Sequence, residues 1–244
     1  MKLIVLCVDG LDPDYAKELG FPKLAYESKL DIPRDLYYEG VPITTLVWPS
    51  ILTGRILDSE IKPAIKLDWI RLPIRKLLHN YGIKWNRKTL LLKKNIKWKS
   101  DPFNMEVENV THKYSNIMWN FPTICPEFIS AAPSKEAMLN FGRREYKVWK
   151  IITDGMCLYP YELSIAYCHL PDYLGHLKKP LESIYLDIHH QAERISKRRA
   201  VMLVSDHGCI DGKHTDHAYL GCTEPVKARN VLEVRDDIEK ILNS

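Results

Sequence analysis

The stretch KLIVLCVDG, residues 2–10, is a run of apolar, partly β-branched residues that ends in an aspartate and a glycine. Such a run, without polar alternation, is typical of a strand buried on both faces of a parallel sheet. Asp12 and Pro13 follow as a helix start, and Gly20 marks the helix end. The stretch therefore predicts a strand, a turn and a helix over residues 13–19. No GxGxxG sequence follows the strand, so the dinucleotide-binding fingerprint is absent.

Two later apolar runs predict further buried strands, LSIAYC at residues 163–168 and AVMLVS at residues 200–205. Amphipathic patterns predict helices over residues 134–150, 179–197 and 231–244. Strands that alternate with helices indicate a mainly parallel sheet. We therefore predict an α/β fold in which a mainly parallel sheet is flanked by helices.

The composition is that of a folded globular chain. Its residues are 45% hydrophobic and 27% charged, which is typical of soluble globular proteins. A length of 244 residues suits one large α/β domain or one domain with a sizeable insertion. The longest apolar run is too short to span a bilayer and lacks a cleavage site, so neither a membrane segment nor a signal peptide is expected. The six cysteines show no CxxC spacing, which argues against a zinc ribbon and a disulfide scaffold. A cytoplasmic location is the simplest expectation.

One segment breaks the α/β rhythm and is strongly basic. Between residues 55 and 99, thirteen Lys and Arg residues stand against three Asp and Glu residues, a net charge of +10. We expect residues 55–124 to form a basic, Trp/Lys-rich insertion or cap on a core of residues 1–54 and 125–244. Tryptophans interleaved with lysines admit a nucleic-acid or nucleotide surface over residues 55–99. The alternative is a solvated cap whose tryptophans pack inward.

Side chains that can bind metals or carry protons follow the three predicted strands. Asp9 ends the first strand, Asp172 and His176 follow the second, and Asp206 and His207 follow the third. Because the carboxyl ends of parallel strands meet at one edge of a sheet, these side chains should converge. Carboxylates and imidazoles are suitable ligands for zinc and for manganese. Two such cations about 3.5–4 Å apart can clamp the attacking and leaving oxygens of a phosphoryl displacement.

The order of five sequence pieces resembles the alkaline phosphatase superfamily, and within it the type I phosphodiesterase/nucleotide pyrophosphatase branch. The pieces are VDGLDPDY, TTLVWPSILTG, PDYLGH, SDHG and GKHTDHAYLG. Cofactor-independent phosphoglycerate mutase is a related family. The resemblance implies an alkaline phosphatase-like core and two divalent cations, Zn²⁺ with Mn²⁺ as the alternative. Residues 55–160 contribute nothing to the match, and RILDSEIKP replaces the Pro-x-x-His-Gly stretch of many relatives, which leaves the substrate class open.

The resemblance also implies a role for each matching residue. The metal ligands would form two groups, Asp9, Asp206 and His207 for one cation, and Asp172, His176 and His214 for the other. The family's nucleophile is a Thr or Ser placed ten residues before the Gly of a TG pair, here Gly54. This spacing gives Thr44 as the nucleophile and a ligand of the first cation, with Thr45 as the neighbouring rival.

The expected activity is that of a phosphodiesterase or nucleotide pyrophosphatase acting on a small phosphate ester or nucleotide. A cation lowers the pKa of a threonine hydroxyl, so attack on phosphorus gives a phosphothreonine that water then hydrolyses. Amides at the helix start of TTLVWPSILTG would help to bind the phosphate. Sulfatase chemistry is disfavoured because no Cys/Ser-x-Pro-x-Arg sequence occurs there. The alternatives are a phosphomutase or phosphomonoesterase of the same superfamily, or a nucleic-acid- or partner-binding protein with a degraded site.

The remaining histidines have less specific assignments. His217 lies three residues after His214 and could replace it as a ligand or bind substrate. His169 is expected to be structural. The pair His189 and His190 is expected on the solvated face of a helix, away from every motif.

Overall fold

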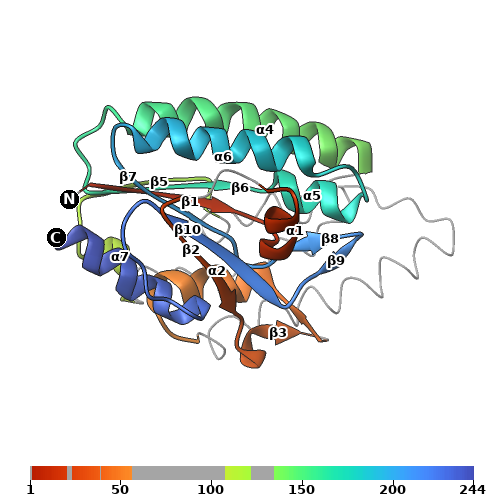
Figure 1. Ribbon diagram of the computed structural model, residues 1–244, viewed down its shortest axis with the longest axis horizontal. Coiled ribbons are helices and arrows are strands. Elements are labelled where there is room, and N and C mark those ends of the chain that lie inside the picture. Colours follow the sequence, from red (N-terminus) through yellow and green to blue (C-terminus); the bar gives the residue numbers. More distant parts are fainter. Residues whose placement is uncertain (1, 21–23, 39, 57–107, 122–134) are drawn as a thin grey trace, which may run out of the picture.

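A six-stranded sheet forms the centre of the computed structural model, which describes residues 2–20, 24–38, 40–56, 108–121 and 135–244. The strand order is β2-β10-β7-β1-β6-β5 (Figure 1). The strands are β1 (Leu3–Val8), β2 (Tyr26–Asp31), β5 (Asn116–Trp119), β6 (Leu163–Cys168), β7 (Ala200–Val204) and β10 (His217–Cys222).

Four adjacent strands of this sheet are parallel. β1 pairs in parallel with β6 on one side and with β7 on the other, and β5 pairs in parallel with β6. β10 is antiparallel both to β7 and to β2 at the opposite edge. The predicted α/β fold with a mainly parallel sheet is confirmed.

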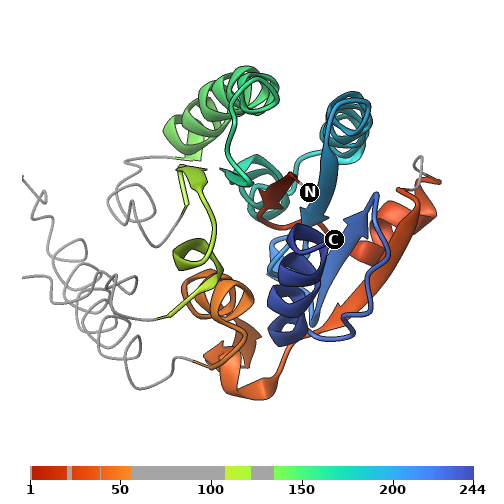
Figure 2. The same cartoon turned by 90° about the vertical axis from the view of Figure 1, so that its left-hand side faces the viewer.

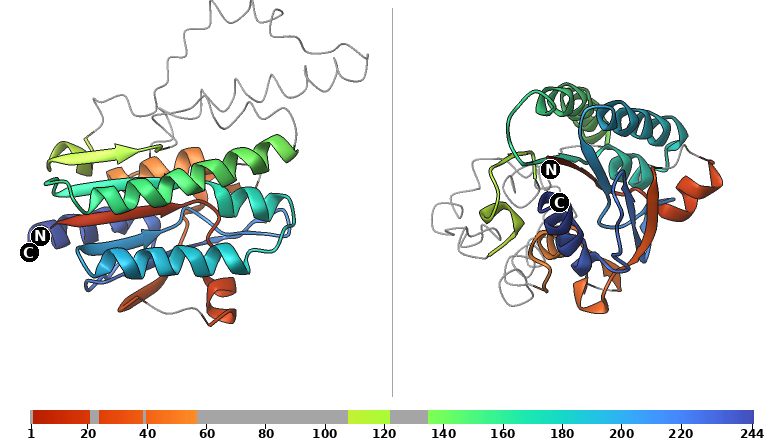
Figure 3. Two further views of the ribbon diagram at one scale, coloured as in Figure 1. Left: turned by 90° about the horizontal axis from the view of Figure 1, so that it is seen from above. Right: turned by 60° about the vertical axis from the view of Figure 1, so that its left-hand side comes forward.

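Helices cover both faces of the sheet. α4 (Lys135–Met156) and α6 (Glu182–Ser196) lie on one face, and α2 (Thr44–Thr53) and α7 (Val234–Leu242) lie on the other (Figures 1 and 2). Seen from above, α4 and α6 run along the strand direction (Figure 3). Side chains of β1 alternate between the core clusters of the two faces, and all six are 0% exposed. This double burial explains the unbroken apolar run of the strand.

Short elements occupy the connections at the carboxyl edge of the sheet. They are α1 (Pro13–Glu18), η1 (Arg34–Leu36), β3 (Tyr37–Tyr38), β4 (Val41–Pro42), α5 (Leu170–His176), β8 (Cys209–Ile210) and β9 (Lys213–His214). Two further short elements, η3 (Val110–His112) and η4 (Val231–Glu233), precede β5 and α7 along the chain.

The predicted elements differ from the observed ones mainly at their ends. β6 matches its prediction, α4 continues to Met156, and α6 starts at Glu182. The motif PDYLGH, which follows the second predicted strand, forms most of α5. Pro171 lies in the first turn of this helix, where the missing amide hydrogen costs no hydrogen bond.

Part of the segment predicted as an insertion belongs to the central sheet. Its residues 116–119 form β5, which extends the sheet beside β6. Residues 57–107 and 122–134 lie outside the described residues. The predicted nucleic-acid surface, with Trp69, Trp85 and Trp98, therefore falls outside the described part of the chain.

The described cysteines are free thiols, and four of them are buried: Cys7, Cys168, Cys209 and Cys222. A reduced cysteine in such a place packs as a small apolar side chain. No helix within the described residues combines the length and the apolar character needed to cross a membrane.

One surface prediction is wrong. His189, expected on a solvated face, is buried, with 1% of its surface exposed. Tyr185 and Ile188 are buried on the same helix, and helical spacing turns His189 toward the sheet with them. Its ring lies 5.9 Å from the ring of Tyr219 on β10. His190 is exposed, as predicted.

Packing of α2 on the sheet can be tested at Trp48. This side chain is 0% exposed, and its ring lies 5.7 Å from that of Phe121 and 5.4 Å from that of Tyr167. Trp48→Ala should lower the free energy of unfolding by about 3–5 kcal/mol because it leaves a cavity in a packed core. Urea unfolding followed by circular dichroism measures this loss. Leu158→Ala, at a residue 78% exposed, should change it by no more than about 0.5 kcal/mol. Equal losses in the two variants would contradict this packing.

Candidate metal centre

The carboxyl edge of the parallel strands brings together all seven predicted site residues. Asp9 follows β1, Asp206 and His207 follow β7, and α5 follows β6 with Asp172 and His176 one helical turn apart. Thr44 is the first residue of α2, and His214 lies on β9. The seven residues therefore come from four separate connections between strands of the sheet, and all of them lie at one end of it.

Four of these residues form the first ligand group, centred on the Nε2 atom of His207. The Oγ1 atom of Thr44 lies 3.0 Å from this nitrogen. The Oδ2 atom of Asp206 lies 3.3 Å from it, and the Oδ1 atom of Asp9 lies 3.5 Å from it. We name Asp9, Thr44, Asp206 and His207 the first ligand group, which is the set that the resemblance implies for one cation.

The other three residues form the second ligand group. The Oδ1 atom of Asp172 lies 3.3 Å from the Nε2 atom of His176 and 3.6 Å from the Nε2 atom of His214. The two Nε2 atoms lie 3.0 Å apart. Asp172 also lies close to the first group, since one ligand atom each from Asp9, Asp172 and His207 fall within 4.8 Å of one another. The two groups are therefore neighbours.

These separations fit a tetrahedral cation. Zinc bonds to nitrogen and oxygen of about 2.0–2.2 Å place neighbouring ligand atoms about 3.3–3.6 Å apart. The three separations from His207 Nε2 in the first group and the three within the second group range from 3.0 to 3.6 Å. Each group could hold one divalent cation with small side-chain adjustments.

The histidine rings present their Nε2 atoms to the candidate cations. The Nδ1–H group of His214 donates to the carbonyl oxygen of Pro42 at 2.9 Å, and that of His207 donates to the carbonyl of Gly208 at 3.1 Å. These bonds define the tautomers in which Nε2 carries the lone pair. The His207 and His214 rings stack with centroids 3.8 Å apart. Burial, and next the charge of His207, lower the pKa of His214, which favours its neutral form.

Buried carboxylate oxygens without hydrogen-bond partners provide an independent test for a cation. Both oxygens of Asp206 and the Oδ1 atoms of Asp9 and Asp172 are buried and lack a partner. Burial, and next the charges of Asp206 and Asp172, raise the pKa of Asp9 well above its ordinary value. Buried polar groups normally have partners because leaving them unpaired is costly. Cations in the two groups would satisfy these oxygens and favour their charged forms, so the residues fit a metal centre.

Three glycines allow the connections around the site to approach closely. A Cβ atom on Gly10 would lie 2.6 Å from the Cα atom of Asp172. One on Gly175 would lie 2.2 Å from the carbonyl oxygen of Cys209, and one on Gly208 would lie 2.4 Å from the Oγ1 atom of Thr215. No side chain fits at these distances. Gly10 also has a φ of 78°, in the region that favours glycine.

A further set of residues, which sequence reasoning missed, supports the ligands. The Tyr167 hydroxyl donates to the Oδ2 atom of Asp9 and leaves Oδ1 turned toward His207. Asp12 accepts hydrogen bonds from the Tyr15 amide at 2.8 Å and the Thr215 hydroxyl at 2.6 Å. Asp12 thereby joins the start of α1 to the loop that carries the histidine ligands. In the sequence, the position of Asp12 before Pro13 indicates only a helix start.

The sequence also gave no role to Cys209, whose Sγ atom lies beside the second ligand group. One ligand atom each from Cys209, Asp172, His176 and His214 fall within 4.8 Å of one another. Cys209 is 0% exposed, and burial, followed by the charge of Asp172, raises the pKa of its thiol.

The remaining candidates lie at the margin of the site. His169 is buried, and its Nδ1 atom lies 2.7 Å from the Glu145 carboxylate, which agrees with a structural role. His217 lies 3.3 Å from Asp31 and enters neither ligand group. The helical backbone of Thr45 is described, but its side chain is not, so the choice between Thr44 and Thr45 rests on the contact of Thr44 with His207.

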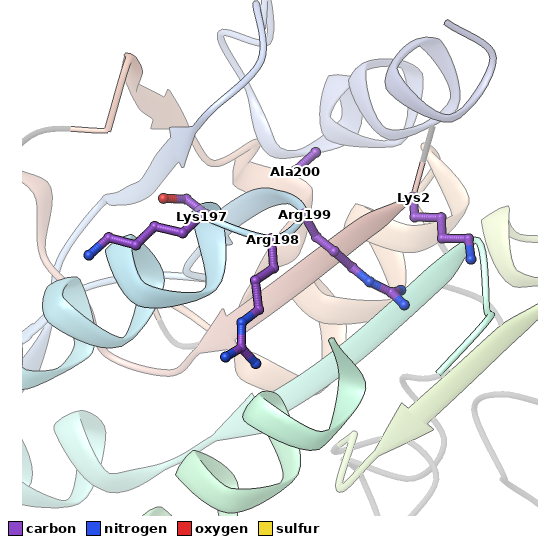
Figure 4. Close-up of a pocket in the computed structure, with 6 residues that line it drawn as sticks. Lys2, Lys197, Arg198, Arg199 and Ala200 are labelled. Atoms are coloured by element: carbon purple, nitrogen blue, oxygen red, sulfur yellow. The ribbon is translucent and has the colours of Figure 1, made fainter. Parts of the chain in front are cut away.

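A basic pocket of about 590 Å³ lies at the opposite end of the sheet (Figure 4). Lys2, which precedes β1, lines it together with Lys197, Arg198 and Arg199, which precede β7. The Arg199 guanidinium donates to the Tyr161 carbonyl at 3.1 Å and is thus partly structural. Because the amino ends of β1 and β7 face away from the ligands, this pocket is separate from the candidate metal centre.

Comparisons with known proteins show similarity of fold. No family model and no curated protein matches the chain. Among solved structures, the PH0037 protein from Pyrococcus horikoshii is similar, with a TM-score of 0.51 and 10% sequence identity. The match covers 99% of this chain and 97% of that one. At this identity the likeness shows a shared fold and carries no activity.

The raised pKa of Asp9 predicts how stability without metal depends on pH. The folded state holds the Asp9 proton to higher pH than the unfolded state, so stability falls as pH rises from the ordinary aspartate range through the raised pKa. Asp9→Asn removes this loss, and with a chelator present the variant should melt at a higher temperature than the wild type at neutral pH. Added Zn²⁺ should reverse the order, because the variant lacks one carboxylate of the first ligand group. Scanning calorimetry measures both effects.

Asp35→Asn is the control, since Asp35 is exposed and lies outside both ligand groups. Its melting temperature should follow that of the wild type in chelator and in Zn²⁺. A wild type that is more stable than Asp9→Asn in chelator at neutral pH would contradict the prediction.

Proposed function

We propose that this protein is a two-metal-dependent phosphoric ester hydrolase, a phosphodiesterase or nucleotide pyrophosphatase with Thr44 as its nucleophile. The observation that carries the proposal is the contact of Thr44 Oγ1 with His207 Nε2 at 3.0 Å. It places a hydroxyl among carboxylate and imidazole atoms at tetrahedral spacing, beside a second group of the same kind. A hydroxyl in one ligand group, with a second ligand group nearby, suits attack on phosphorus when cations are bound.

The ordered sequence motifs provide separate support. Each of the five pieces that resemble the alkaline phosphatase superfamily contributes at least one residue to the two ligand groups. Membership of that superfamily is part of the proposal, as is its type I phosphodiesterase/nucleotide pyrophosphatase branch.

The start of α2 provides a place for the phosphate. Thr44 is the first residue of this ten-residue helix, and the side chain of the N-cap residue Ile43 makes no capping hydrogen bond. Amide groups in the first turn of a helix, together with the helix dipole, favour a bound anion. A phosphate at this position would lie next to the Thr44 hydroxyl.

The reaction follows from these positions. Two bound divalent cations would lower the pKa of the Thr44 hydroxyl and neutralise the charge of the phosphate. The Thr44 hydroxyl releases its proton to solvent, and its oxygen forms a bond to phosphorus while the bond from phosphorus to the leaving oxygen breaks. The leaving oxygen takes up a proton from solvent and departs as an alcohol. Water then cleaves the phosphothreonine, which restores the hydroxyl and releases the product. His207, whose Nε2 atom lies 3.0 Å from the Oγ1 atom of Thr44, would hold the hydroxyl in position for attack.

The donor atoms define the cofactors in this proposal. Carboxylates and imidazoles suit Zn²⁺, with Mn²⁺ as the alternative. The substrate is a small phosphate ester or a nucleotide. The buried free thiols support a reducing compartment such as the cytoplasm for this activity.

Two rival functions share parts of this site. A phosphomonoesterase or phosphomutase would use the same ligands and nucleophile and differ only in substrate. A binding protein with a degraded site is disfavoured, because the ligand set is complete and its carboxylates remain buried without partners. Keeping such groups without a function costs stability.

Replacement of the nucleophile tests the proposal directly. Thr44→Ala should lower turnover by about 10³-fold or more, because no oxygen remains to attack phosphorus. The bound zinc content, measured by plasma emission, should stay near that of the wild type, since Asp9, Asp206 and His207 remain.

Two matched variants complete this test. Thr44→Ser should keep part of the turnover, and Thr45→Ala should keep most of it. Full activity in Thr44→Ala together with loss in Thr45→Ala would move the nucleophile to Thr45.

A pair of chromogenic substrates distinguishes the rival activities. Bis-p-nitrophenyl phosphate should be hydrolysed with a higher kcat/KM than p-nitrophenyl phosphate, and a chelator should abolish both reactions. A preference for the monoester would favour the phosphomonoesterase alternative. Less than one bound divalent ion per chain, with no turnover after addition of zinc or manganese, would favour a binding protein.

A further inference from the structure

The second ligand group has a fourth neighbour of a different chemical kind. The Sγ atom of Cys209 lies within 4.8 Å of the ligand atoms of Asp172, His176 and His214. Asp172, only 8% exposed, has a buried Oδ1 atom without a hydrogen-bond partner in the same place. A thiol, two imidazoles and an unpaired carboxylate oxygen therefore surround one point.

We propose that Cys209 is a ligand of the second cation, so that this site binds a thiophilic divalent metal through one thiolate, two imidazoles and one carboxylate. The proposal rests on the proposed function for the presence of the metal. The resemblance to the superfamily accounts for Asp172, His176 and His214 but assigns no role to a cysteine here.

The backbone holds Cys209 firmly beside the other ligands. Its amide donates to the Gly10 carbonyl at 3.1 Å, which fixes β8 against the end of β1. Its own carbonyl lies against Gly175 on α5, where a Cβ atom would come within 2.2 Å of it. Helix α5, which carries Asp172 and His176, therefore packs closely against strand β8, which carries the thiol.

The remaining distance to a bonded geometry is small. A zinc–sulfur bond of about 2.3 Å and zinc–nitrogen bonds of about 2.0–2.1 Å place sulfur roughly 3.6 Å from its neighbouring ligand atoms. Since the four atoms already lie within 4.8 Å of one another, a side-chain movement of roughly 1 Å closes the set. On binding, the Sγ–H bond breaks, the proton passes to solvent and the Sγ–metal bond forms.

This ligand set has a consequence for metal choice. Thiolates select soft cations such as zinc, whereas carboxylates and imidazoles alone also accept manganese. The first ligand group has no sulfur, so the two sites should differ in preference. Zinc with four protein ligands can still bind a phosphate oxygen because its coordination expands to five.

Cobalt(II) is the probe for this proposal, because a thiolate bound to cobalt gives a charge-transfer band in the near ultraviolet. The metal-free full-length chain is titrated with cobalt, and bound cobalt is measured by plasma emission. The wild type should show the band. Cys209→Ala and Cys209→Ser should lose it while retaining at least one bound cobalt per chain and the visible bands of cobalt.

Cys222→Ala is the matched control, since Cys222 is also a buried thiol in a strand but lies at the other end of the sheet. This variant should keep the near-ultraviolet band and the hydrolytic activity. Circular dichroism verifies that each variant is folded, and Cys209→Ser preserves the side-chain size if Cys209→Ala does not fold.

The outcomes separate the two proposals. A wild type that binds cobalt without the band, or a Cys209→Ala variant that retains the band, overturns the role of Cys209 and leaves the proposed function standing. A folded wild type that binds neither cobalt nor zinc overturns the proposed function, and the role of Cys209 with it.

Discussion

Three carboxylates, Asp9, Asp172 and Asp206, are buried together at the carboxyl edge of the sheet, and the rest of the site depends on this concentration of negative charge. Burial of an unbalanced carboxylate costs several kcal/mol, and like charges nearby increase that cost. The partnerless oxygens of these residues show that the surrounding protein does not satisfy them by hydrogen bonding. Divalent cations would balance this charge, which is the arrangement that the proposed function requires.

The fold supplies the rigidity that such crowding needs. Strand β1 is buried on both faces and pairs with β6 and β7, so the three chain segments that carry the carboxylates are held at fixed separations. Gly10 and Gly175 then let the connections after these strands approach through their backbones, and Gly208 leaves room for the side chains of Asp12 and Thr215. The site is thus built on the most buried strands of the molecule, which is where precise geometry is easiest to maintain.

Supporting contacts determine which atom each ligand presents. The Tyr167 hydroxyl donates a hydrogen bond to one carboxylate oxygen of Asp9. The Pro42 carbonyl accepts a hydrogen bond from the Nδ1–H group of His214 and so determines the tautomer of that histidine. Pro42 lies on β4, so the β3–β4 hairpin takes part in the site although it carries no ligand. Such contacts tune the basicity and direction of the ligands, and their loss typically weakens metal binding 10–100-fold.

The sequence by itself determined the fold class and the edge of the sheet at which the ligands gather, because apolar runs and the residues after them depend on local patterns. The sequence could not reveal β5 at the sheet edge, because its four residues are only partly buried and show no clear alternation of polar and apolar side chains. Nor could it reveal that the side chain of His189 is buried against the sheet. Only the tertiary structure placed Thr44 on His207, joined the two groups through Asp172 and brought Cys209 beside them. These contacts join residues from separate connections, and their distances depend on how closely the packed backbones approach, which local sequence patterns do not encode.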